Sequence, residues 1–158
     1  MSGEIPEELC LLEDLESLVL GGNELVGSMP ACITSLDSLF EIDLHNNDLS
    51  GLLPVGLTSM SKLVRLDLSD NDFSGDLGVL FGSNDATQSR IIRMNLNNNA
   101  FVGDITDPLF LPEGLQELTL HKNALIGDIS ALCSQSSVAL LTADCSQLAC
   151  EGSCCTCF

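Results

Sequence analysis

One pattern of apolar residues followed by asparagine recurs along the chain, and this repeat constrains the fold more than any other feature. The pattern is L-x-x-L-x-L-x-x-N, in which Ile or Met sometimes replaces Leu. Its copies begin at Leu15, Leu39, Leu63, Ile91 and Leu115, at steps of 24, 24, 28 and 24 residues. A degenerate last copy carries Leu140 and has Cys145 in place of the asparagine. Copies at this spacing predict a solenoid in which each copy forms one turn.

The segment x-L-x-L-x within each copy alternates with a period of two, which predicts a short strand with two leucines facing inward. One such strand is not stable alone, so stacked copies are expected to form a parallel sheet over one continuous aliphatic core. The asparagine after each strand stands where the chain turns inward, and its amide can bond to backbone groups of adjacent turns. We therefore predict a structural ladder of Asn23, Asn47, Asn71, Asn99 and Asn123.

The second half of each copy is also patterned. It reads Gly27-Ser28-Met29-Pro30, Gly51-Leu52-Leu53-Pro54, Gly75-Asp76-Leu77, Gly103-Asp104-Ile105 and Gly127-Asp128-Ile129, and the chain opens in the same phase with Gly3-Glu4-Ile5-Pro6. The whole repeat resembles the plant-type subclass of the leucine-rich-repeat family over nearly residues 3–145. The resemblance implies an α/β-type solenoid, a right-handed superhelix with a parallel sheet on its concave face and an irregular or 3-10 helical convex side. It also implies a second short strand in each G-x-I-P stretch. Gly78, Thr106 and Ser130 replace the proline in the later copies, so we expect a less regular second sheet there.

The repeats are expected to fill residues 1–136, beginning with a partial repeat over residues 1–14. Residues 137–158 are expected to form the degenerate last repeat and a cysteine-rich cap. The third copy is four residues longer than its neighbours, and we place the extra length in Phe81–Gln88 as a loop on the convex side.

Six of the eight cysteines lie in the last quarter of the chain. They are Cys133, Cys145, Cys150, Cys154, Cys155 and Cys157. Disulfides among them would cover the apolar core that a solenoid exposes at its end, although a bond between the adjacent Cys154 and Cys155 would be strained. Cys10 and Cys32 lie on neighbouring convex segments and are expected to pair. The alternative is a thiolate zinc site at Cys154–Cys157, but no histidine lies near it in sequence, and no metal or cofactor is expected.

The cysteine-rich ending is also similar to the C-terminal caps of extracellular leucine-rich-repeat proteins of diatoms and related algae. Disulfides form in oxidising compartments, so the chain is expected to be extracellular or at the cell surface. The formal net charge is −18, which would repel nucleic acid and anionic membrane surfaces. Membrane attachment is expected only through segments outside this chain, because no apolar run of spanning length is present.

The residues beside the inward leucines face solvent on the predicted concave sheet and form the candidate ligand-binding surface. They are Glu41, Asp43, His45, Arg65, Asp67, Ser69, Arg93, Asn95, Asn97, Glu117, Thr119 and His121. Arg65 and Arg93 occupy adjacent copies flanked by Glu41 and Glu117, so they either form cross-strand ion pairs or recognise a polar peptide or glycan. No catalytic residue is assigned, because an open face offers His45, Asp43 and Ser69 no pocket or oxyanion hole. A calcium site at Asp43, Asp67 and Asp70 is a further alternative.

The features together favour a non-catalytic recognition module that binds a protein, peptide or glycan through its concave face. The alternatives are a structural subunit of a cell wall, matrix or larger assembly, and an inhibitor of a secreted hydrolase.

Overall fold

The structure, a computed structural model, describes residues 1–81, 89–105, 111–130, 132, 138–149 and 154–158. Most of the predicted loop at Phe81–Gln88 lies outside the described residues, as do Thr106, Cys133 and Cys150. In the described chain, no helix is long and apolar enough to cross a membrane.

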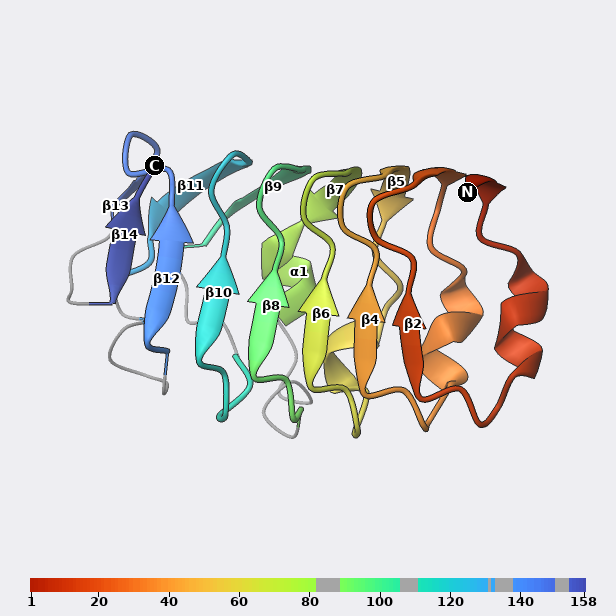
Figure 1. Ribbon diagram of the computed structural model, residues 1–158. Coiled ribbons are helices and arrows are strands. Elements are labelled where there is room, and N and C mark those ends of the chain that lie inside the picture. Colours follow the sequence, from red (N-terminus) through yellow and green to blue (C-terminus); the bar gives the residue numbers. More distant parts are fainter. Residues whose placement is uncertain (82–88, 106–110, 131, 133–137, 150–153) are drawn as a thin grey trace.

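The chain winds into a solenoid with two parallel sheets that run its full length (Figure 1). The sheet in front in Figure 1, called the concave sheet here, contains β2 (Ser17–Val19), β4 (Glu41–Asp43), β6 (Arg65–Asp67), β8 (Arg93–Asn95), β10 (Glu117–Thr119), β12 (Leu140–Ala143) and β14 (Cys155–Cys157). The second sheet contains β1 (Ser2–Glu4), β3 (Glu24–Gly27), β5 (Asp48–Leu52), β7 (Asp72–Asp76), β9 (Ala100–Asp104), β11 (Ala124–Asp128) and β13 (Leu148–Ala149).

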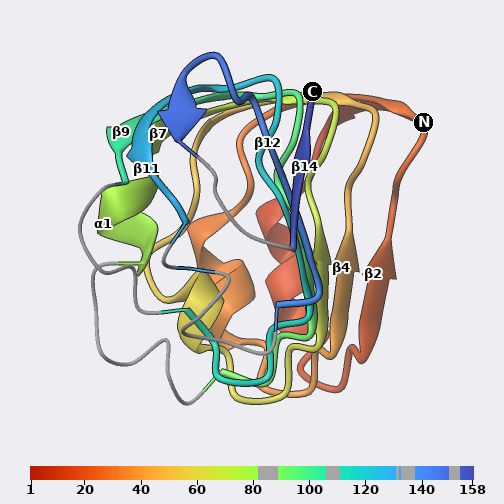
Figure 2. The same cartoon turned by 90° about the vertical axis from the view of Figure 1, so that its left-hand side faces the viewer.

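Short helical turns form the side opposite the concave sheet, as Figure 2 shows. They are the 3-10 helices η1 (Glu7–Leu11), η2 (Ala31–Ser35) and η3 (Leu57–Ser59), and one α-helical turn, α1 (Leu77–Phe81). The predicted fold class is therefore confirmed: a leucine-rich-repeat solenoid with a parallel concave sheet and a mostly 3-10 helical convex side.

The core between the two sheets and the helical turns is mainly aliphatic, as the repeat predicts. The two strand leucines of a copy, for example Leu66 and Leu68, are fully or almost fully buried. Phe73 and Phe101 stand where other copies have Leu25 and Leu49, and both are also buried. Each turn contacts its neighbours along the stack, so the core is continuous along the solenoid.

The asparagine at the end of each concave strand joins adjacent turns through backbone groups. Asn71, for example, donates from Nδ2 to the carbonyl oxygens of Leu44, Leu68 and Ser69 at 2.9, 3.3 and 3.1 Å. Its Oδ1 accepts the backbone N–H of Leu49 at 3.0 Å. Asn47 and Asn99 make the same set of contacts one turn to either side. The ladder satisfies polar backbone groups that the tight winding would otherwise bury without partners.

The second sheet stays regular in the copies that lack the proline, so the sequence prediction of a less regular sheet there is wrong, although β13 in the degenerate last copy has only two residues. Strands β7, β9 and β11 are each five residues long, the same length as β5. The proline position follows the end of the strand, so proline contributes nothing to strand pairing. An aspartate takes over the turn: Asp76 Oδ1 accepts the backbone N–H of Gly78, and Asp128 Oδ1 accepts that of Ser130, both at 2.8 Å.

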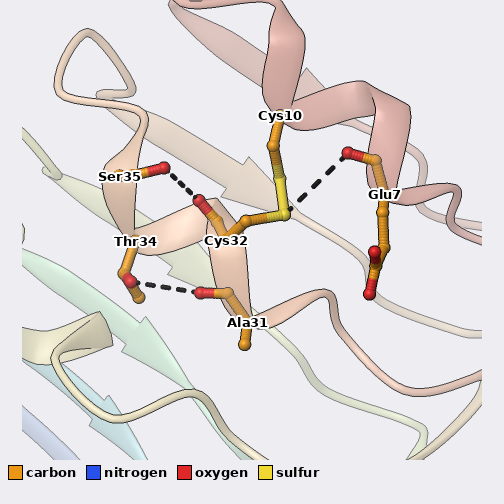
Figure 3. Close-up of a disulfide and its surroundings, with 6 residues drawn as sticks. All are labelled: Glu7, Cys10, Ala31, Cys32, Thr34 and Ser35. Atoms are coloured by element: carbon orange, nitrogen blue, oxygen red, sulfur yellow. Dashed lines mark hydrogen bonds between the residues drawn. A yellow bond between two sulfur atoms is a disulfide. The ribbon is translucent and has the colours of Figure 1, made fainter.

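Disulfides join neighbouring turns near each end of the solenoid. Cys10 on η1 pairs with Cys32 on η2, as predicted, with 6.0 Å between their Cα atoms. Figure 3 shows this bond, with the Cys32 sulfur 3.9 Å from the carbonyl oxygen of Glu7. Near the C-terminus, Cys145 pairs with Cys157 on the edge strand β14.

Cys154 and Cys155 each take part in a disulfide as well. The sulfur atoms of Cys154, Cys155 and Cys157 are thus already in disulfides, so they are not thiolate ligands, and the alternative of a zinc site at this tail is wrong.

Candidate functional site

The concave sheet places the polar residues of successive copies side by side. Its register pairs each residue with the one in the same position of the next copy. The first column runs Ser17, Glu41, Arg65, Arg93 and Glu117, and the next runs Val19, Asp43, Asp67, Asn95 and Thr119. Neighbouring parallel strands lie about 4.8 Å apart. Residues that are 24 or 28 positions apart in sequence therefore form a continuous surface.

Both arginines of the first column form cross-strand ion pairs. Arg65 Nη1 lies 3.3 Å from Glu41 Oε1, and Arg93 Nε lies 3.6 Å from Glu117 Oε2. The arginine side chains nevertheless remain 56% exposed. Since each guanidinium carries five N–H groups, both retain donors for a ligand. A shallow depression between them is lined by Ile42 and Leu66 and by the polar residues Glu41, Asp43, Arg65, Asp67, Arg93 and Asn95.

A network of short hydrogen bonds follows at the C-terminal ends of β4, β6 and β8. Asp43 Oδ1 lies 2.6 Å from Nδ1 of His45, and this hydrogen bond, together with the negative charge nearby, raises the pKa of His45 above its usual 6.5. Asp67 accepts from the hydroxyl of Ser69 at 2.6 Å and from the amide of Asn95 at 2.8 Å. The network fixes the directions of these side chains before any ligand arrives.

The remaining candidates lie toward the C-terminal end of the sheet. Thr119 donates its hydroxyl to Asn97 Oδ1 at 2.7 Å. His121 lies 2.8 Å from the hydroxyl oxygen of Thr142 through Nδ1, and its ring stacks on Phe158 with 4.1 Å between the ring centroids. Burial lowers the pKa of His121 below 6.5, so the two histidines of the chain shift in opposite directions.

The geometry gives no support to catalysis by a histidine-activated serine. The Ser69 hydroxyl donates its hydrogen bond to Asp67, and the His45 ring is hydrogen-bonded to Asp43, so the serine and the imidazole have different partners. A nucleophilic serine needs the imidazole itself as its hydrogen-bond partner.

The carboxylates considered for calcium are each bonded to a protein donor. Asp70 accepts a hydrogen bond from the side-chain amide of Asn98 at 2.5 Å. Asp43 is hydrogen-bonded to His45, and Asp67 to Ser69 and Asn95. In the parts of the chain that the structure describes, no three His, Cys, Asp or Glu side chains form a group able to hold a metal ion.

Two exposed cations beside this surface were missed by the strand-based reading of the sequence. Lys62 and Arg90 each stand three residues before an arginine, Lys62 before Arg65 and Arg90 before Arg93. They lie just before β6 and β8, outside the alternating pattern. They occupy the same repeat position in two adjacent copies, directly before Leu63 and Ile91, and this repetition could have identified them from the sequence.

Comparison with known proteins identifies the repeat. The family model for leucine-rich repeats matches residues 13–73. No curated protein sequence matches the chain significantly.

Solved structures with the same fold include plant receptor ectodomains. The leucine-rich-repeat ectodomain of the receptor kinase SOBIR1 from Arabidopsis thaliana is 31% identical, with a TM-score of 0.69; the match covers 80% of this chain and 68% of that one. A TDR receptor is 29% identical with a TM-score of 0.72, over 89% of this chain and 25% of the receptor chain. The Arabidopsis receptor kinase HAESA, in complex with the peptide hormone IDA and the co-receptor SERK1, is 27% identical with a TM-score of 0.65, over 89% of this chain and 28% of that one. This chain thus spans about a quarter of the TDR receptor and of HAESA.

Proposed function

The chain belongs to the leucine-rich-repeat family, and we propose that it is an extracellular binding module whose concave sheet receives a peptide or an extended segment of another protein. The observation that carries this proposal is the register of the concave sheet, which aligns two exposed arginines and several half-buried carboxylates around a shallow depression at β4, β6 and β8. A flat, polar surface of this kind fits an extended backbone better than a compact small molecule, which needs an enclosing pocket.

The comparisons support the same choice of ligand. HAESA, a structure of the same fold, was solved with a peptide hormone and a co-receptor. The SOBIR1 structure is an ectodomain of a receptor kinase, and the disulfides of this chain fit the same compartment. A role in binding, without catalysis, agrees with the hydrogen bonds of His45 and Ser69.

The candidate residues are proposed to include hydrogen-bond donors and hydrogen-bond acceptors for the ligand. Arg65 and Arg93 offer guanidinium donors to carboxylates or backbone carbonyls, while Asp43 and Asp67 accept from basic or amide groups. Asn95 links the two sets, since it lies two residues after Arg93 on β8 and donates a hydrogen bond to Asp67 on β6.

Selection of a displayed peptide library on the intact, oxidised protein tests the proposal. The selected peptides are then measured against Arg65→Ala, Asp67→Ala and a control, Glu8→Ala, which changes an exposed residue of η1 on the opposite side. We expect the two concave variants to weaken binding about tenfold each, the effect of losing one charged contact at an interface, and the control to leave it unchanged. A glycan array run in parallel identifies the alternative ligand class.

Peptides that bind equally well to all three variants would place the binding surface elsewhere. A folded protein that selects no peptide, but binds glycans or assembles with itself, would contradict the proposal in favour of the carbohydrate or structural role.

A further inference from the structure

Four of the five Lys and Arg side chains of this acidic chain are concentrated at one place. All five cationic side chains, Lys62, Arg65, Arg90, Arg93 and Lys122, lie in or beside the concave strands. Four of them belong to the two adjacent copies that form β6 and β8. The whole chain carries 23 Asp and Glu side chains, so this cluster is a local exception to its net charge of −18.

The four cations lie within a small area at the start of the two strands. Arg65 and Arg93 are directly paired in register. Ile92 donates its N–H to the carbonyl oxygen of Val64 at 2.9 Å, so the same register continues one residue further toward Lys62 and Arg90. Three residues of extended chain span at most about 10 Å, and adjacent strands lie about 4.8 Å apart. One short anionic segment can therefore contact all four side chains.

Most of this positive charge remains available to a ligand. Within the described parts of the chain, neither Lys62 nor Arg90 takes part in an ion pair, and both are exposed. Arg65 and Arg93 each have one carboxylate partner, at opposite sides of the cluster. The four cations thus outnumber the two glutamates that contact them.

Two neighbouring strands, β4 and β6, end in negative charge, whereas β8 ends in the neutral Asn95. Asp43 and Asp67 are neighbours in register at the last positions of β4 and β6, and Asp70 follows three residues later. Along β6 the chain therefore runs from Lys62 and Arg65 to Asp67 and Asp70 within nine residues. The face therefore has a positive pole at the starts of β6 and β8 and a negative pole at the ends of β4 and β6.

We propose that this polarity selects and orients an amphoteric peptide segment, with its acidic residues on Lys62, Arg65, Arg90 and Arg93 and its basic residues on Asp43, Asp67 and Asp70. The inference rests on the proposed function and specifies its ligand class and direction: the segment lies along the strands, across the depression between the two poles. A long polyanion fits poorly, because the copies on either side of the cluster present carboxylates at the same level. These are Glu41 and Glu117 in the column of Arg65 and Arg93, and Asp37 and Glu113, each one residue before the position equivalent to Lys62 and Arg90.

A spin-labelled probe peptide tests the orientation by NMR on the isotope-labelled protein. The probe is a nonapeptide with three glutamates, a Gly-Ser-Gly spacer and three lysines, carrying a nitroxide at either its acidic or its basic end. We expect the label on the acidic end to broaden the amide signals of Lys62 and Arg90, and the label on the basic end to broaden those of Asp43 and Asp67. A peptide of the same nine residues with alternating charges is expected to bind at least fivefold more weakly.

Two substitutions that change the net charge equally distinguish the effect of the cluster on binding from the effect of the net charge. Arg90→Glu is expected to weaken binding of the probe at least fivefold, whereas Lys122→Glu, on a strand end outside the cluster, is expected to change it less than twofold. Equal broadening from both labels, equal effects of the two substitutions, or no binding of the probe would each overturn the inference. If library-selected peptides still bind the concave face when the probe does not, the inference fails and the proposed function stands.

Discussion

Replacing Asn71 by alanine tests whether the asparagine ladder holds the solenoid together. The Asn71 side chain is only 8% exposed, and it donates to three carbonyl oxygens and accepts one N–H. Its two amide hydrogens satisfy about two of the three acceptors fully, at roughly 1 kcal/mol for each hydrogen bond. The orphaned N–H of Leu49, which is fully buried, adds about 1–3 kcal/mol. We therefore expect Asn71→Ala to lower the free energy of unfolding by about 3–5 kcal/mol.

Asn23→Ala is the matched control at the N-terminal end of the ladder. Asn23 donates only to Leu20 and Gly21 of its own turn, and its Oδ1 accepts from the exposed N-terminal ammonium group. No buried donor is orphaned there, so we expect a loss of about 1 kcal/mol. Urea unfolding followed by circular dichroism measures both losses, and hydrogen exchange at the Leu49 amide reports the local effect of Asn71→Ala. A loss below about 1 kcal/mol for Asn71→Ala, or equal losses for the two variants, would refute the reasoning.

Two further predictions concern the first disulfide and the histidines. The double substitution Cys10→Ser and Cys32→Ser opens a covalent loop with a sequence separation of 22 and should lower the free energy of unfolding in urea by about 3 kcal/mol, since the unfolded chain regains loop entropy; an unchanged unfolding midpoint would contradict this. NMR titration should give His45 a pKa above 6.5 and His121 a pKa below it, and Asp43→Asn should lower only the first; the reverse order would show that the hydrogen bond does not control His45. Because the folded-state pKa of His45 is raised, its protonated form stabilises the fold below about pH 6.5, and that contribution is lost as the pH rises through the raised pKa.

The register of the concave sheet was predictable from the sequence because every copy keeps the same phase between its leucines. The column positions of Arg65 and Arg93 follow from this phase alone, although the third copy is four residues longer. The extra residues fall after the core positions, so Arg65 and Arg93 still pair directly. An insertion between Leu66 and Leu68, within the alternating segment, would have changed which side chains face solvent.

The finer structure of the site was not predictable from the repeat. The bonds from Asn95 to Asp67 and from Thr119 to Asn97 depend on which rotamers adjacent side chains adopt together. Lys62 and Arg90 were missed for another reason. They lie in the segments leading into the strands, where the repeat imposes no alternation, and only their relation to each other across two copies identifies them.

The prediction of a less regular second sheet is wrong because aspartates stabilise the turns that follow its strands. Proline has no N–H, so a copy with proline after the strand leaves no donor to satisfy at that position. When Gly78 or Ser130 takes that place, its N–H needs an acceptor, and an aspartate two residues earlier supplies one. The hydrogen bonds from Ser130 lower the pKa of Asp128, so this carboxylate stabilises its turn at neutral pH and loses that effect as the pH falls through the lowered value. Part of the net charge therefore has a structural cause, and the negative charge of the molecule as a whole is weaker evidence for a basic partner than the carboxylates that end β4 and β6.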